Sequence, residues 1–156
     1  MLLRSNSNAT RAIFWGGLIC GAMDLTAAIV MYGLVRGRSP VLIMQSIATG
    51  LLGAKSYEGG LKTAVLGVAL HFLIATIWAT VFYLASRKLT FLFRHPIVCG
   101  ILYGIAVYFF MQLIVLPLSA FPHKISFTFP VLATGLIIHM FCVGLPISLI
   151  TSKYSK

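Results

Sequence analysis

Four long apolar runs with few strongly polar side chains make up most of this chain. They cover residues 12–34, 63–85, 96–120 and 129–150. A helix needs about 20 apolar residues to cross the hydrocarbon core of a bilayer, and each run is long enough. Inside lipid, backbone groups must find partners within their own segment, and a helix provides them. The pattern therefore predicts an all-α polytopic membrane protein with four transmembrane helices.

A shorter apolar run follows the first span, at residues 40–54. Ser39 is a favourable N-cap and Pro40 a favourable first helical residue, so a helix should begin there. The run is too short to cross a bilayer, and we expect a short re-entrant, interfacial or buried helix. Gln45 and Thr49, one turn apart, give it a polar edge. Because these five segments account for most of the chain, we expect a single membrane domain over residues 1–156.

The composition agrees with this picture and limits the choice of partners. Sixty per cent of the residues are hydrophobic and 9% are charged, whereas a soluble domain has about 25% charged residues. The net charge of +10 comes from Lys and Arg placed singly or in pairs near the ends of spans. Nucleic-acid binding would instead gather them on one face. We therefore expect the lipid bilayer as partner and no nucleic acid.

The same cations predict an orientation. Four spans place both termini and the second loop on one side, which holds seven cations, while the other side holds five. The positive-inside rule then puts both termini in the cytoplasm. Arg36 and Arg38, just past the first span, oppose this orientation. The first side carries Arg4, Arg11, Arg87, Lys88, Arg94, Lys153 and Lys156, and the second carries Arg36, Arg38, Lys55, Lys62 and Lys124.

Each span carries one polar residue on the face where small residues recur every three or four positions. Residues at this spacing share a helix face, and small residues let helices approach closely in lipid. We therefore expect these faces to meet and the polar side chains to point inward. The small residues are Gly17, Gly21, Gly67, Gly100, Gly104 and Gly135. The polar ones are Asp24, His71, Gln112 and His139.

Depth in the bilayer brings three of these groups to one level. At the helical rise, Asp24, His71 and His139 each lie roughly 13–15 Å from the same membrane face, and Gln112 is shallower. Asp24 is one of only two acids in the chain, and an ionisable group at this depth usually has a partner or a function. The four residues are therefore a candidate polar midplane site.

Two uses of this site stay open. In a proton-linked pathway, Asp24 accepts the proton, His71 and His139 relay it, and Gln112 contacts a small solute or ion. Alternatively, the four side chains only form interhelical hydrogen bonds, which average about 0.6 kcal/mol in membranes. The first use predicts a small transport or channel-like protein. The second predicts a structural or accessory membrane subunit.

Metal binding and catalysis are weaker alternatives. Two His and one carboxylate can hold zinc or iron, but here they come from three helices without a local motif, so we expect no metal and no cofactor. The second acid, Glu58, lies in a loop, and no Ser–His or Cys–His arrangement is visible from the spacing. We expect no enzymatic activity and no catalytic residue.

The two halves of the chain share a spacing. The Gly-x-x-x-Gly of residues 17–21 recurs at 100–104, and the Gly-x-x-x-His of residues 67–71 recurs at 135–139. Since the first and third spans cross in the same direction, a duplication would give a parallel repeat. Gly-x-x-x-small spacing is also common in membrane helices in general, so both origins remain open.

Several stretches resemble a family of small bacterial inner-membrane proteins without an assigned activity, and more loosely the YagU-type proteins. They are residues 17–24, 38–40 and 45–53, the span around His71, and residues 115–119. The resemblance implies four helices in a bacterial cytoplasmic membrane and brings no catalytic or ligand-binding residues. Because four helices leave little room for a pathway, a homodimer would also fit.

Overall fold

The computed structural model describes residues 2–123 and 127–155, and all regular structure in these ranges is helical. Lys124 and Lys156, two cations of the orientation count, lie outside the described residues. The helices are α1 (Leu2–Ala28), α2 (Pro40–Leu52), α3 (Gly60–Lys88), α4 (Phe91–Arg94), α5 (Pro96–Phe110), α6 (Leu116–Leu118), α7 (Phe129–Ile138) and α8 (Leu145–Ser155). Three π-helical segments, η1 (Ile29–Val35), η3 (Met111–Val115) and η4 (His139–Gly144), continue α1, α5 and α7, and the 3₁₀ segment η2 (Gly53–Glu58) follows α2.

Four helical stretches are long and apolar enough to cross a membrane, which confirms the predicted all-α polytopic fold. They are Ser7–Val35, Gly60–Lys88, Pro96–Leu118 and Phe129–Ser155. Most run a few residues past the apolar runs, since polar residues at an interface can continue a helix. Many large apolar side chains face outward, among them Leu73, Ile77, Leu102, Leu113 and Ile137. An apolar surface of this extent belongs in lipid, and the chain is an integral membrane protein.

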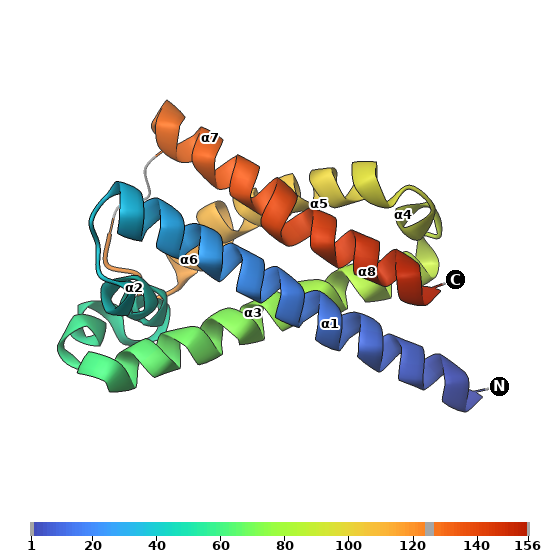
Figure 1. Cartoon of the computed structure of the whole chain (residues 1–156), viewed down its shortest axis with the longest axis horizontal. Helices are drawn as coiled ribbons and strands as arrows, with labels where there is room; N and C mark the ends of the chain where they lie inside the picture. The colour runs from blue at the N-terminus through green and yellow to red at the C-terminus, as the bar shows by residue number, and fades with distance from the viewer. Residues whose placement is uncertain (1, 124–126, 156) are drawn as a thin grey trace.

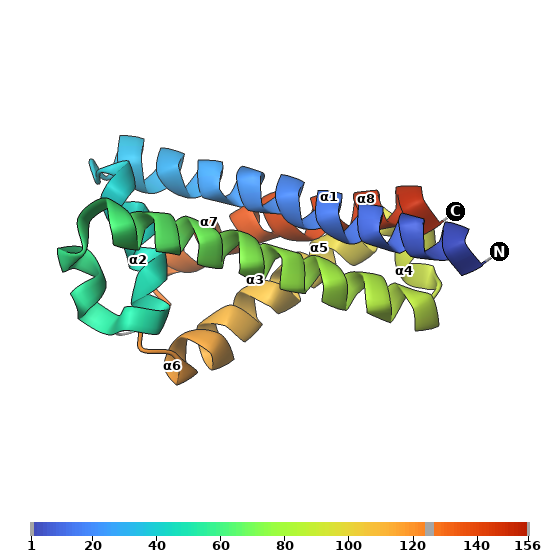
Figure 2. The ribbon, with the colours of Figure 1, turned by 90° about the horizontal axis from the view of Figure 1, so that it is seen from below.

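The four spans pack as one bundle (Figures 1 and 2). α1 lies along α3 and also along η4 and α8. α5 lies along η4 and α8 as well. Both termini and α4 lie at one end of the bundle, and α2 fills the other end. In each half the two recurring motifs lie on neighbouring spans. Residues 17–21 are beside residues 67–71 through the Gly21–His71 contact, and residues 100–104 are beside residues 135–139 through the Gly104–His139 contact.

Glycines permit the close approach of these helices. A Cβ on Gly104 would overlap the carbonyl of His139, and a Cβ on Gly144 would overlap the carbonyl of Gly100. No larger residue fits there, because backbone atoms cannot rotate away. The six glycines named from the sequence all lie against another helix: Gly17 and Gly21 against α3, Gly67 against α2, Gly100 against α8, Gly104 against η4, and Gly135 against α5.

The π-helical segments η3 and η4 directly precede prolines. Pro117 and Pro146 lack a backbone N–H, and each ring collides with the carbonyl four residues earlier. Those carbonyls belong to Leu113 and Cys142, which lie inside η3 and η4. A wider π turn relieves this crowding, and such turns recur at functional sites. One of them begins at His139.

The short helix is fastened by its polar edge. Ser39 caps α2, since its Oγ accepts a hydrogen bond from the backbone N–H of Leu42 at 3.3 Å. Gln45 Nε2 donates to the Gly60 carbonyl at 3.0 Å and to Thr63 Oγ1 at 3.2 Å. Ser56 Oγ donates to the Gln45 carbonyl at 2.6 Å. These bonds fix α2 against the start of α3, where it forms one wall of the site.

Candidate functional site

Asp24 on α1 and His71 on α3 form the centre of the site. His71 Nε2 lies 2.9 Å from the Gly21 carbonyl oxygen and 3.9 Å from Asp24 Oδ2. A carbonyl oxygen only accepts, so Nε2 carries the hydrogen and donates it. Exposed fractions of 22% for the Asp24 side chain and 14% for that of His71 show that both are sheltered. The acid of the first span therefore faces a neighbouring helix and an imidazole.

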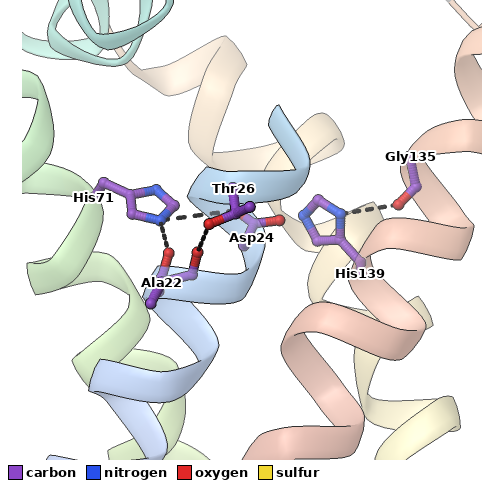
Figure 3. Close-up of polar contacts among 7 residues, drawn as sticks. Ala22, Asp24, Thr26, His71, Gly135 and His139 are labelled. Atoms are coloured by element: carbon purple, nitrogen blue, oxygen red, sulfur yellow. Dashed lines mark hydrogen bonds and ion pairs between the residues drawn. The ribbon is translucent and has the colours of Figure 1, made fainter. Parts of the chain in front are cut away.

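His139 lies on the fourth span, at the start of η4. Its Nδ1 donates to the Gly135 carbonyl at 2.9 Å, and its ring meets that of Tyr108 edge to face, with centroids 5.2 Å apart. Figure 3 shows the Asp24 side chain between the rings of His71 and His139. The three side chains come from three spans and line one cavity.

Each imidazole has one nitrogen fixed and the other available for a proton. His71 holds Nε2 on a backbone carbonyl, and His139 does the same with Nδ1. The bond made by one ring nitrogen sets the tautomer, and hence which nitrogen gains or loses a proton. Protons can therefore be exchanged at Nδ1 of His71 and at Nε2 of His139 while both rings keep their positions.

The central cavity that these groups line has a volume of about 420 Å³. Its lining residues come from all four spans and from α2, and Figure 2 shows α6 slanting away from α3. Most of its wall is apolar, including Ile47, Leu51, Leu70, Ile74, Trp78, Val107, Met111, Val115 and Val143. Small-molecule sites of roughly 300–1,000 Å³ are typically apolar with a few convergent polar groups, and this cavity has that character.

A second cavity, the vestibule, has a volume of about 820 Å³. It shares Asp24, Ser46, Ile47, His71 and Phe121 with the central cavity, so the two meet at the Asp24–His71 pair. We call this junction the Asp24–His71 neck. Beyond it, the polar side chains that line the vestibule are Tyr32, Arg36, Arg38, Tyr57 and His123. The two cavities therefore adjoin at this neck, and the lining of the vestibule carries two arginines near the α2 end of the bundle.

Aromatic side chains close the central cavity toward the termini. Trp78 packs edge to face on Phe110, with ring centroids 5.2 Å apart, and Tyr103 packs on Phe82 at 4.8 Å. The Tyr103 hydroxyl donates to the Trp78 carbonyl at 2.7 Å and ties α5 to α3. These contacts pack α5 against α3 beside Trp78, on the side of the cavity that faces the termini.

Gln112 does not line either cavity, contrary to the expectation that all four polar residues converge. It continues the face of Gly104 and Tyr108, which packs against the fourth span. The cavity instead faces Val107, Met111 and Val115 of the third span. The spacing correctly predicted that the face of Gly104 and Tyr108 packs against another span. A different face of the third span borders the cavity.

The metal alternative finds no ligand set. Among residues 2–123 and 127–155, no group of three or more His, Cys, Asp or Glu side chains could hold a metal ion. Sequence reasoning missed Trp78 as part of the cavity wall and Gly144 as a packing residue. It treated Arg36 and Arg38 only as orientation signals, whereas the structure places both in the lining of the vestibule.

No protein-family model, no curated protein and no solved structure matches this chain.

Proposed function

We propose that this protein is a small proton-linked transport protein of a bacterial inner membrane, with both termini in the cytoplasm. The observation that carries the proposal is the cavity shared by Asp24, His71 and His139, three groups able to exchange protons. In this scheme Asp24 binds the proton and the two imidazoles pass it on. The vestibule admits the solute from the outer side, and the aromatic layer around Trp78 closes the cytoplasmic side.

Two further features support this assignment. Polar and ionisable groups inside a membrane protein mark substrate or proton pathways, since they are costly to bury without a role. Transporter sites typically form between spans near the bilayer midplane, and these three groups come from three spans and line one cavity. Both cavities lie within one chain, so the proposal does not depend on a homodimer.

The test is flux into liposomes at two pH values, with an internal pH indicator and a panel of solutes. The wild type is expected to move protons together with at least one solute. Asp24→Asn keeps the shape but removes the proton-binding carboxylate, and it is expected to abolish the coupling. His95→Gln is the matched control, because His95 is exposed at the start of α5 and lines neither cavity.

A second candidate function, as a structural or accessory subunit, has its own supporting observation. The His71 hydrogen bond to the Gly21 carbonyl ties α3 to α1, as a purely architectural residue would. On this reading Asp24→Asn lowers thermal stability in detergent and leaves flux unchanged. Unchanged flux in Asp24→Asn would rule out the proton-binding role of Asp24. No flux of any solute by the wild type, with co-purification of a larger complex, would rule out transport.

A further inference from the structure

The two cavities differ in chemistry, and together they describe one kind of ligand. The central cavity is apolar except around Asp24, Ser46, Ser119 and the two histidines. The vestibule presents two guanidinium groups, from Arg36 and Arg38. A molecule that fills both has an apolar part and a charged part. Building on the proposed function, we propose that the substrate is a single-chain anionic amphiphile, a carboxylate with an alkyl tail.

Charge decides in favour of an anion. Arg36, Arg38 and His123 line the vestibule, and Asp24 is its one acidic lining residue. The Asp24 carboxylate already has His71 as partner at 3.9 Å. No carboxylate in the described ranges forms a salt bridge with either arginine, since the Asp24–His71 pair is the one ion pair there. Guanidinium forks that are free of acidic partners bind carboxylates strongly, often through two hydrogen bonds.

Contacts with Tyr32 position both arginines beside the vestibule. The Arg36 guanidinium lies over the Tyr32 ring, 5.1 Å from its centroid. The Arg38 backbone N–H donates to the Tyr32 carbonyl at 3.0 Å and closes the turn after η1. The carboxylate would bind here, and the tail would pass the Asp24–His71 neck.

The size of the central cavity favours one short alkyl chain. Its volume of about 420 Å³ is near the lower end of small-molecule sites. Trp78 lies on its wall and reports on whatever occupies it. The chain has two tryptophans. The other, Trp15, lines neither cavity and is 42% exposed on the outside of α1.

This placement allows a direct binding test in phosphatidylcholine nanodiscs at pH 8. The probe is 12-bromododecanoate, whose terminal bromine quenches a tryptophan that it touches. In Trp15→Phe, which retains only Trp78, quenching is expected to saturate and to be reversed by unlabelled dodecanoate. In Trp78→Phe, which retains only Trp15, quenching is expected to rise without saturation, as for a probe dissolved in lipid.

Removing the cations should weaken binding. Hydrogen bonds to charged groups are stronger than those between neutral groups, so Arg36→Gln with Arg38→Gln is expected to raise the Kd about tenfold or more. Lys62→Gln is the matched control, since Lys62 is at the same end and lines neither cavity. Unsaturable quenching of Trp78, equal competition by dodecyltrimethylammonium, or an unchanged Kd in the double variant would each overturn the assignment.

Competition on the otherwise native Trp15→Phe protein tests the headgroup without any change to the arginines. Dodecanoate is expected to compete, and dodecanol is expected to be at least tenfold weaker. Displacement by phosphatidylglycerol in the bilayer, with none by dodecanoate, would assign the arginines to lipid headgroups instead. Saturable binding without proton-linked flux would refute the transport function and leave the ligand assignment standing. Flux of another solute, without dodecanoate binding, would refute the ligand assignment and leave the transport function standing.

Discussion

Replacing Gly104 by alanine tests the packing that positions His139. The added Cβ would overlap the His139 carbonyl and approach the Met140 Cα at 2.7 Å, so α5 and η4 must move apart. Glycine to alanine in a helix normally stabilises by about 0.5–1 kcal/mol. Overpacking against atoms that cannot rotate destabilises by about 1–3 kcal/mol. Because the nearest atoms belong to the backbone, the upper part of this range, about 2–3 kcal/mol, applies, and the net expectation is a free energy of unfolding lower by about 1–2.5 kcal/mol.

Gly50→Ala is the matched control for this substitution. Gly50 is also helical, but its Cβ would be 3.9 Å from Ser119, an ordinary contact. This variant is expected to be neutral or more stable by up to about 1 kcal/mol.

The assay is unfolding in mild detergent by titration with a denaturing detergent, followed by circular dichroism. Because the Gly104 contact involves the His139 backbone, the Gly104 variant is also expected to lose proton-linked flux. A Gly104→Ala protein as stable as the wild type would refute the close approach of α5 and η4. Equal shifts for both variants would do the same.

Three further outcomes are expected. Ser56→Ala should lower the free energy of unfolding by about 0.5–1.5 kcal/mol in the same assay, because it removes the buried hydrogen bond that Ser56 Oγ donates to the Gln45 carbonyl. Ser46→Ala, which loses only a bond within its own helix, should change little. Tyr103→Phe should cost about 0.6–2 kcal/mol by losing the bond to the Trp78 carbonyl, and a larger effect would mean that the ring has also moved. Because the C-terminus is predicted to be cytoplasmic, a fluorescent protein fused there should fluoresce and alkaline phosphatase fused there should be inactive. The reverse result would mean that the orientation is inverted.

Much of the site could be anticipated from the sequence because the bilayer restricts the choices. Asp24 is a lone acid in an apolar run, and in lipid such a group turns toward protein. His71 and His139 follow glycines at helical spacing, which places them on packed faces. Gln112 satisfied the same rule and still lies outside the cavities, because the face it shares with Gly104 is taken up by the fourth span.

The vestibule could not be anticipated, because its parts are far apart in the chain. Arg38, Tyr57 and His123 come from three different connections. The packing of α2 on α3, together with the hydrogen bond from the Ala120 N–H to the Gly50 carbonyl, brings them around one cavity. The π-helical start at His139 likewise depends on how Pro146 is accommodated, and a Gly-x-x-x-His spacing carries no information about it.

The sequence by itself determined the helices, their approximate ends and the small faces where they meet. Insertion into lipid and hydrogen bonding within each helix are local requirements, and runs of apolar residues encode them directly. Only the tertiary structure decided which polar side chains share a cavity and where that cavity opens. Those outcomes depend on which face of each helix its neighbours leave uncovered, and that follows from the packing of all four spans together.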